Sequence, residues 1–328
     1  MDASGARTRV AILDDYQSAA LDAADWSRLD ADVVTFRDPL PDAASVVAAL
    51  RGFDVVVAMR ERTAFPEQVL AGLADLRLLV TTGMRNAAID VAAARRLGIT
   101  VCGTRGHAGP TVELTWALIL GLVREVAADD AAVRAGAWQT RVPGDLEGRT
   151  LGIVGLGRLG ARVAAVGRAF GMSVIAWSPN LTEDRARAAD AVAVEKAELF
   201  SRADIVSLHL ALSDSTRGIV GADDLRRMSR HAILVNTARG PLVDEVALCR
   251  AVEERWIDGV GLDVYDHEPV PRDHWLRRAD ASTGARVLRS PHMGFVTRGN
   301  YRTFYGDAVE DIAAFFAGRP IRELDGEA

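Results

Sequence analysis

Three side chains in the second half of the chain are of the types that transfer a proton and hold a carboxylate. Arg239, Glu268 and His292 each follow a separate apolar, strand-like run, so a parallel sheet would bring them to one edge. A histidine gives or takes a proton near neutral pH, and a carboxylate bonded to its ring orients it and favours its protonated form. An arginine grips a substrate carboxylate through paired hydrogen bonds. We therefore expect His292 as acid or base, Glu268 as its partner and Arg239 as the substrate clamp. Taken singly, the two charged residues also suit solvated loop positions, and the histidine also suits a structural role.

A glycine motif indicates which reaction this proton transfer accompanies. An apolar run, Thr150–Val154, leads into Gly155-x-Gly157-x-x-Gly160 and then into a helical pattern. The first glycine permits a tight turn, the second lets the backbone approach a pyrophosphate, and the third lets the helix pack closely on its strand. The N–H groups of the first helical turn, which includes Arg158 and Leu159, face the phosphates. This pattern predicts a dinucleotide site, and a nicotinamide that carries hydride to a carbon bearing oxygen needs the proton that a histidine supplies.

The glycine spacing alone is weak evidence, because glycine-rich turns are common. Here a second strand-like run, Ser173–Trp177, follows the helix and ends where the ribose-reading residue of a βαβ unit is expected. Ligands of such sheets bind beyond the carboxyl ends of the strands. The residues at those ends therefore complete the expected cofactor site: Ser178, Thr237, Asp263 and Gly294.

Apolar runs alternate with alanine-rich helical stretches on both sides of the glycine motif. Five strand-like runs precede it: Val10–Leu13, Val33–Phe36, Asp54–Ala58, Leu78–Thr82 and Ile99–Cys102. Four more come after the βαβ unit: Ala203–Leu210, Ala232–Thr237, Gly259–Tyr265 and Arg286–Arg289. This alternation predicts an α/β protein with two doubly wound parallel-sheet domains.

Two long helices are also expected. One runs from Thr111 to about Ala137, and its apolar stripe is broad enough for a subunit or domain contact, although an ordinary core face explains it equally well. The other spans Thr297 to Phe316 and is expected to return to the first domain.

Composition restricts the function classes. The 328 residues suit about two domains, and 49% hydrophobic with 26% charged residues is typical of a globular protein. The net charge of −6 offers no basic field for nucleic acid or acidic lipid. With no signal-like segment and no long uncharged apolar stretch, we expect a cytoplasmic protein without nucleic-acid or membrane partners. Cys102 and Cys249 are expected as buried thiols and no metal site is expected, while His209 suits either a cofactor contact or a packed strand end.

The motifs together resemble those of the D-isomer-specific 2-hydroxyacid dehydrogenases. The resemblance rests on the segments Val154–Gly160, Leu234–Glu245, Gly261–Pro269 and Ser290–Gly294. It implies that Arg239, Glu268 and His292 are the catalytic set and that Asp263 lies where the family holds the nicotinamide carboxamide. It also implies a Rossmann-type cofactor domain, residues 104–296, inserted in a flavodoxin-like substrate domain, residues 1–103 and 297–328. A homodimer formed through the cofactor domain is the expected assembly.

The chain departs from the family pattern in its expected substrate loop. The family loop after the fourth strand supplies small residues whose N–H groups bind the substrate carboxylate, whereas here it contains Gly83, Met84 and the bulky Arg85. The last of these either reaches the substrate or points to solvent. Arg60, just past the third strand, is similar to a family position that sometimes meets a second anionic group of the substrate.

A second departure concerns cofactor choice. Ser178 stands where members that use NAD commonly have an aspartate, which bonds the ribose hydroxyls and repels a 2′-phosphate. Without that carboxylate, NADP is not excluded, and we expect use of both NAD and NADP, or a lean toward NADP.

The sequence therefore predicts a reductase that converts a 2-oxo acid into a D-2-hydroxy acid with hydride from NAD(P)H. The alternative is a corepressor-like dimer that senses a dinucleotide without physiological turnover. Formate dehydrogenase is disfavoured, because its relatives lack a glutamate paired with the catalytic histidine.

Overall fold

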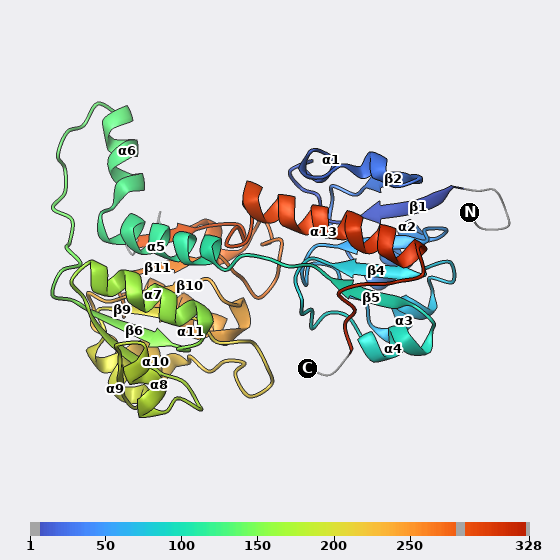
Figure 1. Cartoon of the computed structure of the whole chain (residues 1–328). Helices are drawn as coiled ribbons and strands as arrows, with labels where there is room; N and C mark the ends of the chain where they lie inside the picture. Colours follow the sequence, from blue (N-terminus) through green and yellow to red (C-terminus); the bar gives the residue numbers. More distant parts are fainter. Residues whose placement is uncertain (1–6, 280–285, 326–328) are drawn as a thin grey trace. The chain divides into compact units, whose positions relative to one another are not determined.

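The computed structural model describes residues 7–279 and 286–325. The chain divides into two units. Unit 1 contains the residues up to His107 and those from Val296 onward, and unit 2 spans Ala108–Phe295. Each unit contains one parallel sheet with helices packed on it (Figure 1). Two parallel-sheet α/β domains, one inserted in the other, are confirmed.

The sheet of unit 1 has the strand order β2-β1-β3-β4-β5, which is the flavodoxin-like order. Its strands are β1 (Thr8–Ile12), β2 (Ala31–Thr35), β3 (Val55–Ala58), β4 (Leu78–Thr81) and β5 (Thr100–Gly103). Register is set across the centre, where Val10 pairs with Val33 on one side and with Val55 on the other. Every residue of β3 and β4 is buried, as expected when helices cover both faces of a parallel sheet.

Helices cover both faces of this sheet. A core cluster joins alternate strand residues to α2 (Ala43–Leu50), α3 (Glu67–Ala71) and α4 (Val91–Arg96). The long α13 (Arg298–Phe316) packs against β4 and the short α1 (Ala20–Ala23), on the side away from α3 and α4 (Figure 1). A short 3₁₀ turn, Trp26–Arg28, precedes β2. α13 begins where the sequence predicted, because the Thr297 hydroxyl accepts a hydrogen bond from the N–H of Asn300.

The sheet of unit 2 has the order β12-β11-β10-β9-β6-β7-β8, a Rossmann arrangement with one added strand. Its strands are β6 (Thr150–Val154), β7 (Ser173–Trp177), β8 (Val192–Ala193), β9 (Ile205–Leu208), β10 (Ile233–Asn236), β11 (Gly259–Leu262) and β12 (Arg286–Arg289). The order reverses between β6 and β9, so the ligand crevice of such a sheet opens at the end of β6. The sequence did not predict β8, because two residues carry too little periodicity.

Two cores fill the faces of the second sheet. One lies under α5 (Gly109–Val123), α7 (Arg158–Ala169) and α8 (Glu183–Ala188). The other lies under α9 (Lys196–Arg202), α10 (Ala222–Arg227) and α11 (Glu245–Glu253). Short 3₁₀ turns occur at Gly240–Leu242 and Trp275–Arg277.

The prediction of one helix from Thr111 to about Ala137 was wrong. The chain breaks at Glu125, which has a left-handed conformation with φ of 53°, and resumes as α6 (Val126–Arg134). Arg286 of β12 donates to the carbonyl of Leu122 at 2.6 Å and pairs with the Glu125 carboxylate at 3.2 Å. The contact to Leu122 gives a carbonyl at the C-terminus of α5 a hydrogen-bond partner. Arg286 lies more than 160 positions away in the sequence, so local periodicity cannot reveal this end of the helix.

Candidate active site

The glycine turn joins β6 to α7 in the geometry that a dinucleotide requires. Gly155 has φ of +102°, and a Cβ there would lie 2.7 Å from the carbonyl carbon of His209. A Cβ at Gly160 would lie 2.2 Å from the Gly155 oxygen, so both positions exclude a side chain. At Gly157, by contrast, the described residues place no atom within 4 Å of such a Cβ. The turn therefore leaves open space beside the second glycine, at the N-terminus of a twelve-residue helix, which fits a pyrophosphate.

Ser178 lies at the end of β7 and contacts this turn. Its hydroxyl accepts a hydrogen bond from the N–H of Leu156 at 3.1 Å. The serine thus holds the backbone beside the second glycine, a role that sequence spacing did not indicate.

His209 lies at the end of β9, the strand that neighbours β6 on the side opposite β7. Its ring Nε2 is 2.9 Å from the Ser207 hydroxyl, and its main chain packs on Gly155. Burial lowers the pKa of His209 to about 4, so its ring is neutral near pH 7. His209 therefore packs against the glycine turn through its main chain, as expected of a buried residue at a strand end.

Asp263 organises the loop that follows β12. Its two carboxylate oxygens accept the N–H groups of Met293, at 2.7 Å, and Gly294, at 2.8 Å. Burial raises the pKa of Asp263, although hydrogen bonds from Ser290 and from these two N–H groups act in the opposite direction. The buried carboxylate is thereby fixed against the loop that carries His292.

His292 and Glu268 lie in direct contact. The ring Nδ1 is 2.5 Å from Oε2 of Glu268, and the second carboxylate oxygen accepts the N–H of Tyr265 at 2.9 Å. The backbone of His292 has a left-handed φ of 56°, which costs a non-glycine residue about 1–2 kcal/mol. Its N–H donates to the carbonyls of Asp263, at 2.8 Å, and Ser290, at 3.1 Å, which hold this conformation.

Arg239 follows β10, the neighbour of β11 in the sheet. The amide of the buried Asn236 braces this loop: its Nδ2 donates to the Arg239 carbonyl at 2.8 Å and its Oδ1 accepts the N–H of Ala238 at 3.0 Å. The Arg239 side chain is partly buried and donates to the Ala238 carbonyl at 2.7 Å. The structure therefore brings Arg239, Glu268 and His292 to one end of three adjacent parallel strands.

Thr237 and Gly294 complete the set expected near the cofactor. The hydroxyl of Thr237 lies 2.8 Å from that of Thr115 on α5, and the Gly294 carbonyl accepts from Thr111 at 2.9 Å. Both strand-end positions are thus tied to the first turns of α5. The two α5 threonines were not predicted from the sequence, because only their distant partners distinguish them.

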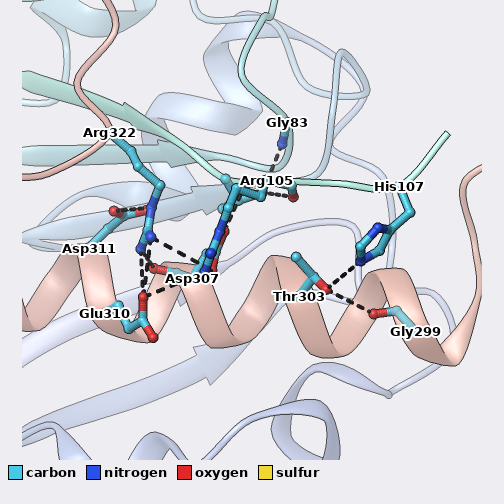
Figure 2. Close-up of polar contacts among 10 residues, drawn as sticks. Gly83, Arg105, His107, Gly299, Thr303, Asp307, Glu310, Asp311 and Arg322 are labelled. Atoms are coloured by element: carbon cyan, nitrogen blue, oxygen red, sulfur yellow. Dashed lines mark hydrogen bonds and ion pairs between the residues drawn. The ribbon is translucent and has the colours of Figure 1, made fainter.

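The expected substrate residues lie in unit 1. Arg60 donates to the carbonyl of Thr82 at 3.2 Å and lies against Gly83, where a Cβ would come within 2.0 Å of its guanidinium. The Gly83 N–H donates to the buried hydroxyl of Thr104 at 2.9 Å, beside Arg105 and α13 (Figure 2). The Gly83 N–H is thus directed into the fold. Met84 and Arg85, which come next, are exposed.

Within residues 7–279 and 286–325, no group of three or more histidine, cysteine, aspartate or glutamate side chains is placed to hold a metal ion. Among the helices of these residues, none is both long and apolar enough to cross a bilayer.

Comparison with known proteins places this site in a family. Residues 116–294 match the model of the D-isomer specific 2-hydroxyacid dehydrogenase, NAD binding domain. The chain is 39% identical to a glyoxylate reductase of Aeropyrum pernix over 241 residues, which is 70% of each protein. It is 32% identical to a glycerate dehydrogenase of Methylorubrum extorquens over 284 residues, 84% of this chain and 86% of that protein. The crystal structure of a phosphoglycerate oxidoreductase from Vibrio cholerae is similar with a TM-score of 0.87 and 34% identity, covering 95% of this chain and 99% of that one.

The chain belongs to the D-isomer specific 2-hydroxyacid dehydrogenase family. It is an oxidoreductase with an NAD-binding Rossmann domain, and the family resemblance inferred from the four motifs is confirmed.

Proposed function

We propose that the protein reduces a 2-oxo acid to the D-2-hydroxy acid, with His292 as the acid. The observation that carries this proposal is the 2.5 Å contact between Nδ1 of His292 and Glu268, at the same end of the sheet as the glycine turn. The glyoxylate reductase and glycerate dehydrogenase among its relatives support small 2-oxo acids as the substrate class.

The roles follow from the geometry of each side chain. Because Nδ1 of His292 is bonded to Glu268, Nε2 is the ring nitrogen that gives its proton to the substrate carbonyl oxygen. Glu268 keeps the ring oriented and compensates its charge when it is protonated. Arg239 binds the substrate carboxylate and polarises the neighbouring carbonyl.

A bound reduced nicotinamide dinucleotide supplies the hydride. The N-terminus of α7, with Arg158 and Leu159, would hold its pyrophosphate, and Thr237, Asp263 and Gly294 lie at strand ends along the same crevice. Asp263 is committed to two N–H groups, but each carboxylate oxygen has a second lone pair with which to accept an amide.

We also propose that both NAD and NADP are used. Ser178 puts no carboxylate where it would repel a 2′-phosphate. Arg185 of α8 donates to the carbonyl of Asn180, two residues past Ser178, so a cation lies near this loop without being directed at the ribose position.

In unit 1 we assign the substrate carboxylate to the backbone N–H groups of Met84 and Arg85, two exposed residues. The contribution of Gly83 is then its backbone conformation, since its own N–H is bonded to Thr104. Arg60 and Arg85 are the cations that would favour a substrate with a second anionic group.

The test is a spectrophotometric assay of NADH and NADPH oxidation. The substrates are glyoxylate, hydroxypyruvate, pyruvate, a bulkier 2-oxo acid and a phosphorylated 2-oxo acid. His292→Gln should lower kcat by roughly 10² or more, the usual scale for a lost acid, while the dissociation constant of NADH stays near that of the parent. A preference for the phosphorylated substrate that disappears in Arg60→Ala or Arg85→Ala would support the role of the two arginines.

Two outcomes would overturn the proposal. Turnover of His292→Gln close to that of the parent would remove the histidine from the mechanism. Absence of turnover with every substrate, together with tight NADH binding, would favour the dinucleotide-sensing alternative, which none of the relatives described above supports by name. A cytoplasmic location and a homodimer formed through unit 2 stay predictions of the same proposal.

A further inference from the structure

The loops that carry Arg239, Glu268 and His292 all contact one residue, Tyr265. It lies three residues past the end of β11. A Cβ at Gly240, the residue after Arg239, would come within 2.1 Å of the Tyr265 carbonyl carbon and 2.5 Å of the next backbone nitrogen. The arginine loop and the tyrosine peptide are thus packed backbone to backbone, with no room for a side chain between them.

The backbone N–H of Tyr265 contacts the glutamate. It donates to Oε1 of Glu268 at 2.9 Å, while the other oxygen, Oε2, meets the histidine ring. Glu268 is only partly buried, so these two contacts orient a carboxylate that would otherwise be able to rotate. The peptide of Tyr265 therefore sets the direction from which the carboxylate approaches His292.

The hydroxyl of Tyr265 contacts the histidine loop. It donates to the carbonyl of Ser290 at 2.9 Å, with a longer contact of 3.3 Å to the carbonyl of Leu262. The same Ser290 oxygen accepts the backbone N–H of His292 at 3.1 Å. The Ser290 carbonyl oxygen thus links the Tyr265 hydroxyl to the backbone of His292, whose left-handed conformation orients the imidazole ring. Burial raises the pKa of Tyr265 to about 12, so the hydroxyl remains a donor throughout the physiological range.

We propose that Tyr265 is a positioning residue that aligns His292 and Glu268 with the loop of Arg239. This inference rests on the proposed function, in which His292 gives the proton, and it adds a residue that does not touch the substrate. Substitution of the Tyr265 side chain leaves its main-chain contacts in place. The hydrogen bond from its hydroxyl to Ser290 is therefore the contact that a variant can remove.

Tyr265→Phe removes that bond and keeps the aromatic ring. We expect kcat to fall about three- to tenfold, the scale of one hydrogen bond, with the KM of the 2-oxo acid and the dissociation constant of NADH within about twofold of the parent. The solvent deuterium isotope effect on kcat should increase, because proton transfer from a misaligned ring becomes more rate-limiting. A purely structural role would lower the melting temperature without changing the isotope effect.

Tyr301→Phe is the matched control. This tyrosine of α13 is buried, whereas Tyr265 is partly buried, and the Tyr301 hydroxyl likewise donates a hydrogen bond, to Gln17 at 2.9 Å in unit 1. The control should lose similar stability and keep the kcat of the parent. The inference is overturned if Tyr265→Phe has the kcat and isotope effect of the parent, or if both variants lose kcat equally. Failure of the proposed function is recognised separately, by retained turnover in His292→Gln.

Discussion

At the scale of single residues, Ser178 has a structural contact in the fold and, in the proposed function, a place beside the cofactor. Its hydroxyl accepts the N–H of Leu156 in the glycine turn, and it occupies the position at the end of β7 from which a ribose is read. An aspartate here can accept the same N–H. A substitution to aspartate can therefore add selection against a 2′-phosphate while keeping the hydrogen bond that holds the turn.

Ser178→Asp should shift the cofactor preference toward NADH. A carboxylate next to the 2′-phosphate of NADPH adds a like-charge contact in a partly dehydrated site, and we expect the ratio of kcat/KM for NADH over NADPH to rise about 10- to 100-fold. Steady-state kinetics with both cofactors measures it. Ser178→Ala is the control, because it removes the bond to Leu156 without adding charge and should weaken both cofactors alike. A parent enzyme that already prefers NADH strongly would show that another residue reads the ribose.

The sequence predicted candidate site residues wherever a residue type suited to the chemistry follows the end of a strand-like run. His292, Glu268 and Asp263 each follow an apolar run, and the structure brings them together as that placement predicted. Thr104 and Tyr265 were not predicted, because only the residues that they contact distinguish them. The first holds the N–H of Gly83 from 21 positions away, and the second bonds the carbonyl of Ser290 from 25 positions away. A single sequence carries no sign of such pairings.

At the scale of elements, α13 is tied to the end of β5 and to the C-terminal segment by a cluster of charges. Arg105 holds the buried carboxylate of Asp307 through its backbone N–H and two guanidinium contacts, of which the shortest is 2.6 Å. Arg322 reaches Asp307, Glu310 and Asp311 on the same helix, as Figure 2 shows. Burial acts to raise the pKa of Asp307, but hydrogen bonds from Arg105 and the nearby cations lower it overall. For Asp311, by contrast, burial dominates and the pKa is raised.

Asp311 should make the stability of unit 1 depend on pH. Burial of its carboxyl, only partly offset by Arg322, raises its pKa from 3.8 to about 7. The folded protein therefore binds this proton more tightly than the unfolded chain, and stability falls as pH rises from about 4 to about 7. Asp311→Asn keeps an acceptor for Arg322 but has no charge to bury. We expect it to gain up to about 4 kcal/mol of unfolding free energy over the parent at pH 8 relative to pH 4.

Urea unfolding of both proteins at the two pH values measures this difference. Comparing the variant with the parent removes the contribution of all other titrating groups. A stability difference that is the same at pH 4 and at pH 8 would show that folding does not raise the pKa of Asp311.

The strands were predicted more reliably than the long helix after β5. Buried parallel strands are short apolar runs whose ends are visible in the sequence, and those of unit 1 begin and end within two residues of the runs that predicted them. The break at Glu125 is set by Arg286, which arrives from another strand, and the residues on either side of it favour helix. Local propensity was overridden there by a tertiary contact.

At the scale of the whole molecule, α6 and the segment after it give unit 2 a surface that suits a second copy of the chain. In the described structure none of the nine residues of α6 is buried, and the helix stands apart from the sheet (Figure 1). Helices of this length are marginal in water without packing. Large apolar side chains are exposed along it and beyond: Val126, Val133, Trp138 and Val142. Isologous packing of this surface, the commonest form of homo-oligomer, would cover them.

Trp138→Glu should therefore convert the proposed homodimer into a monomer. The side chain is 78% exposed in the single chain. Because an isologous interface contains each residue twice, the variant would add two charges to it, one from each copy. Sedimentation equilibrium should give twice the chain mass of 35.2 kDa for the parent and the mass of one chain for the variant. Val246→Glu on α11 is the matched control, since this valine is 67% exposed on a different element and should leave the dimer intact. A parent that sediments as a monomer, or a Trp138 variant that remains dimeric, would exclude this surface as the interface.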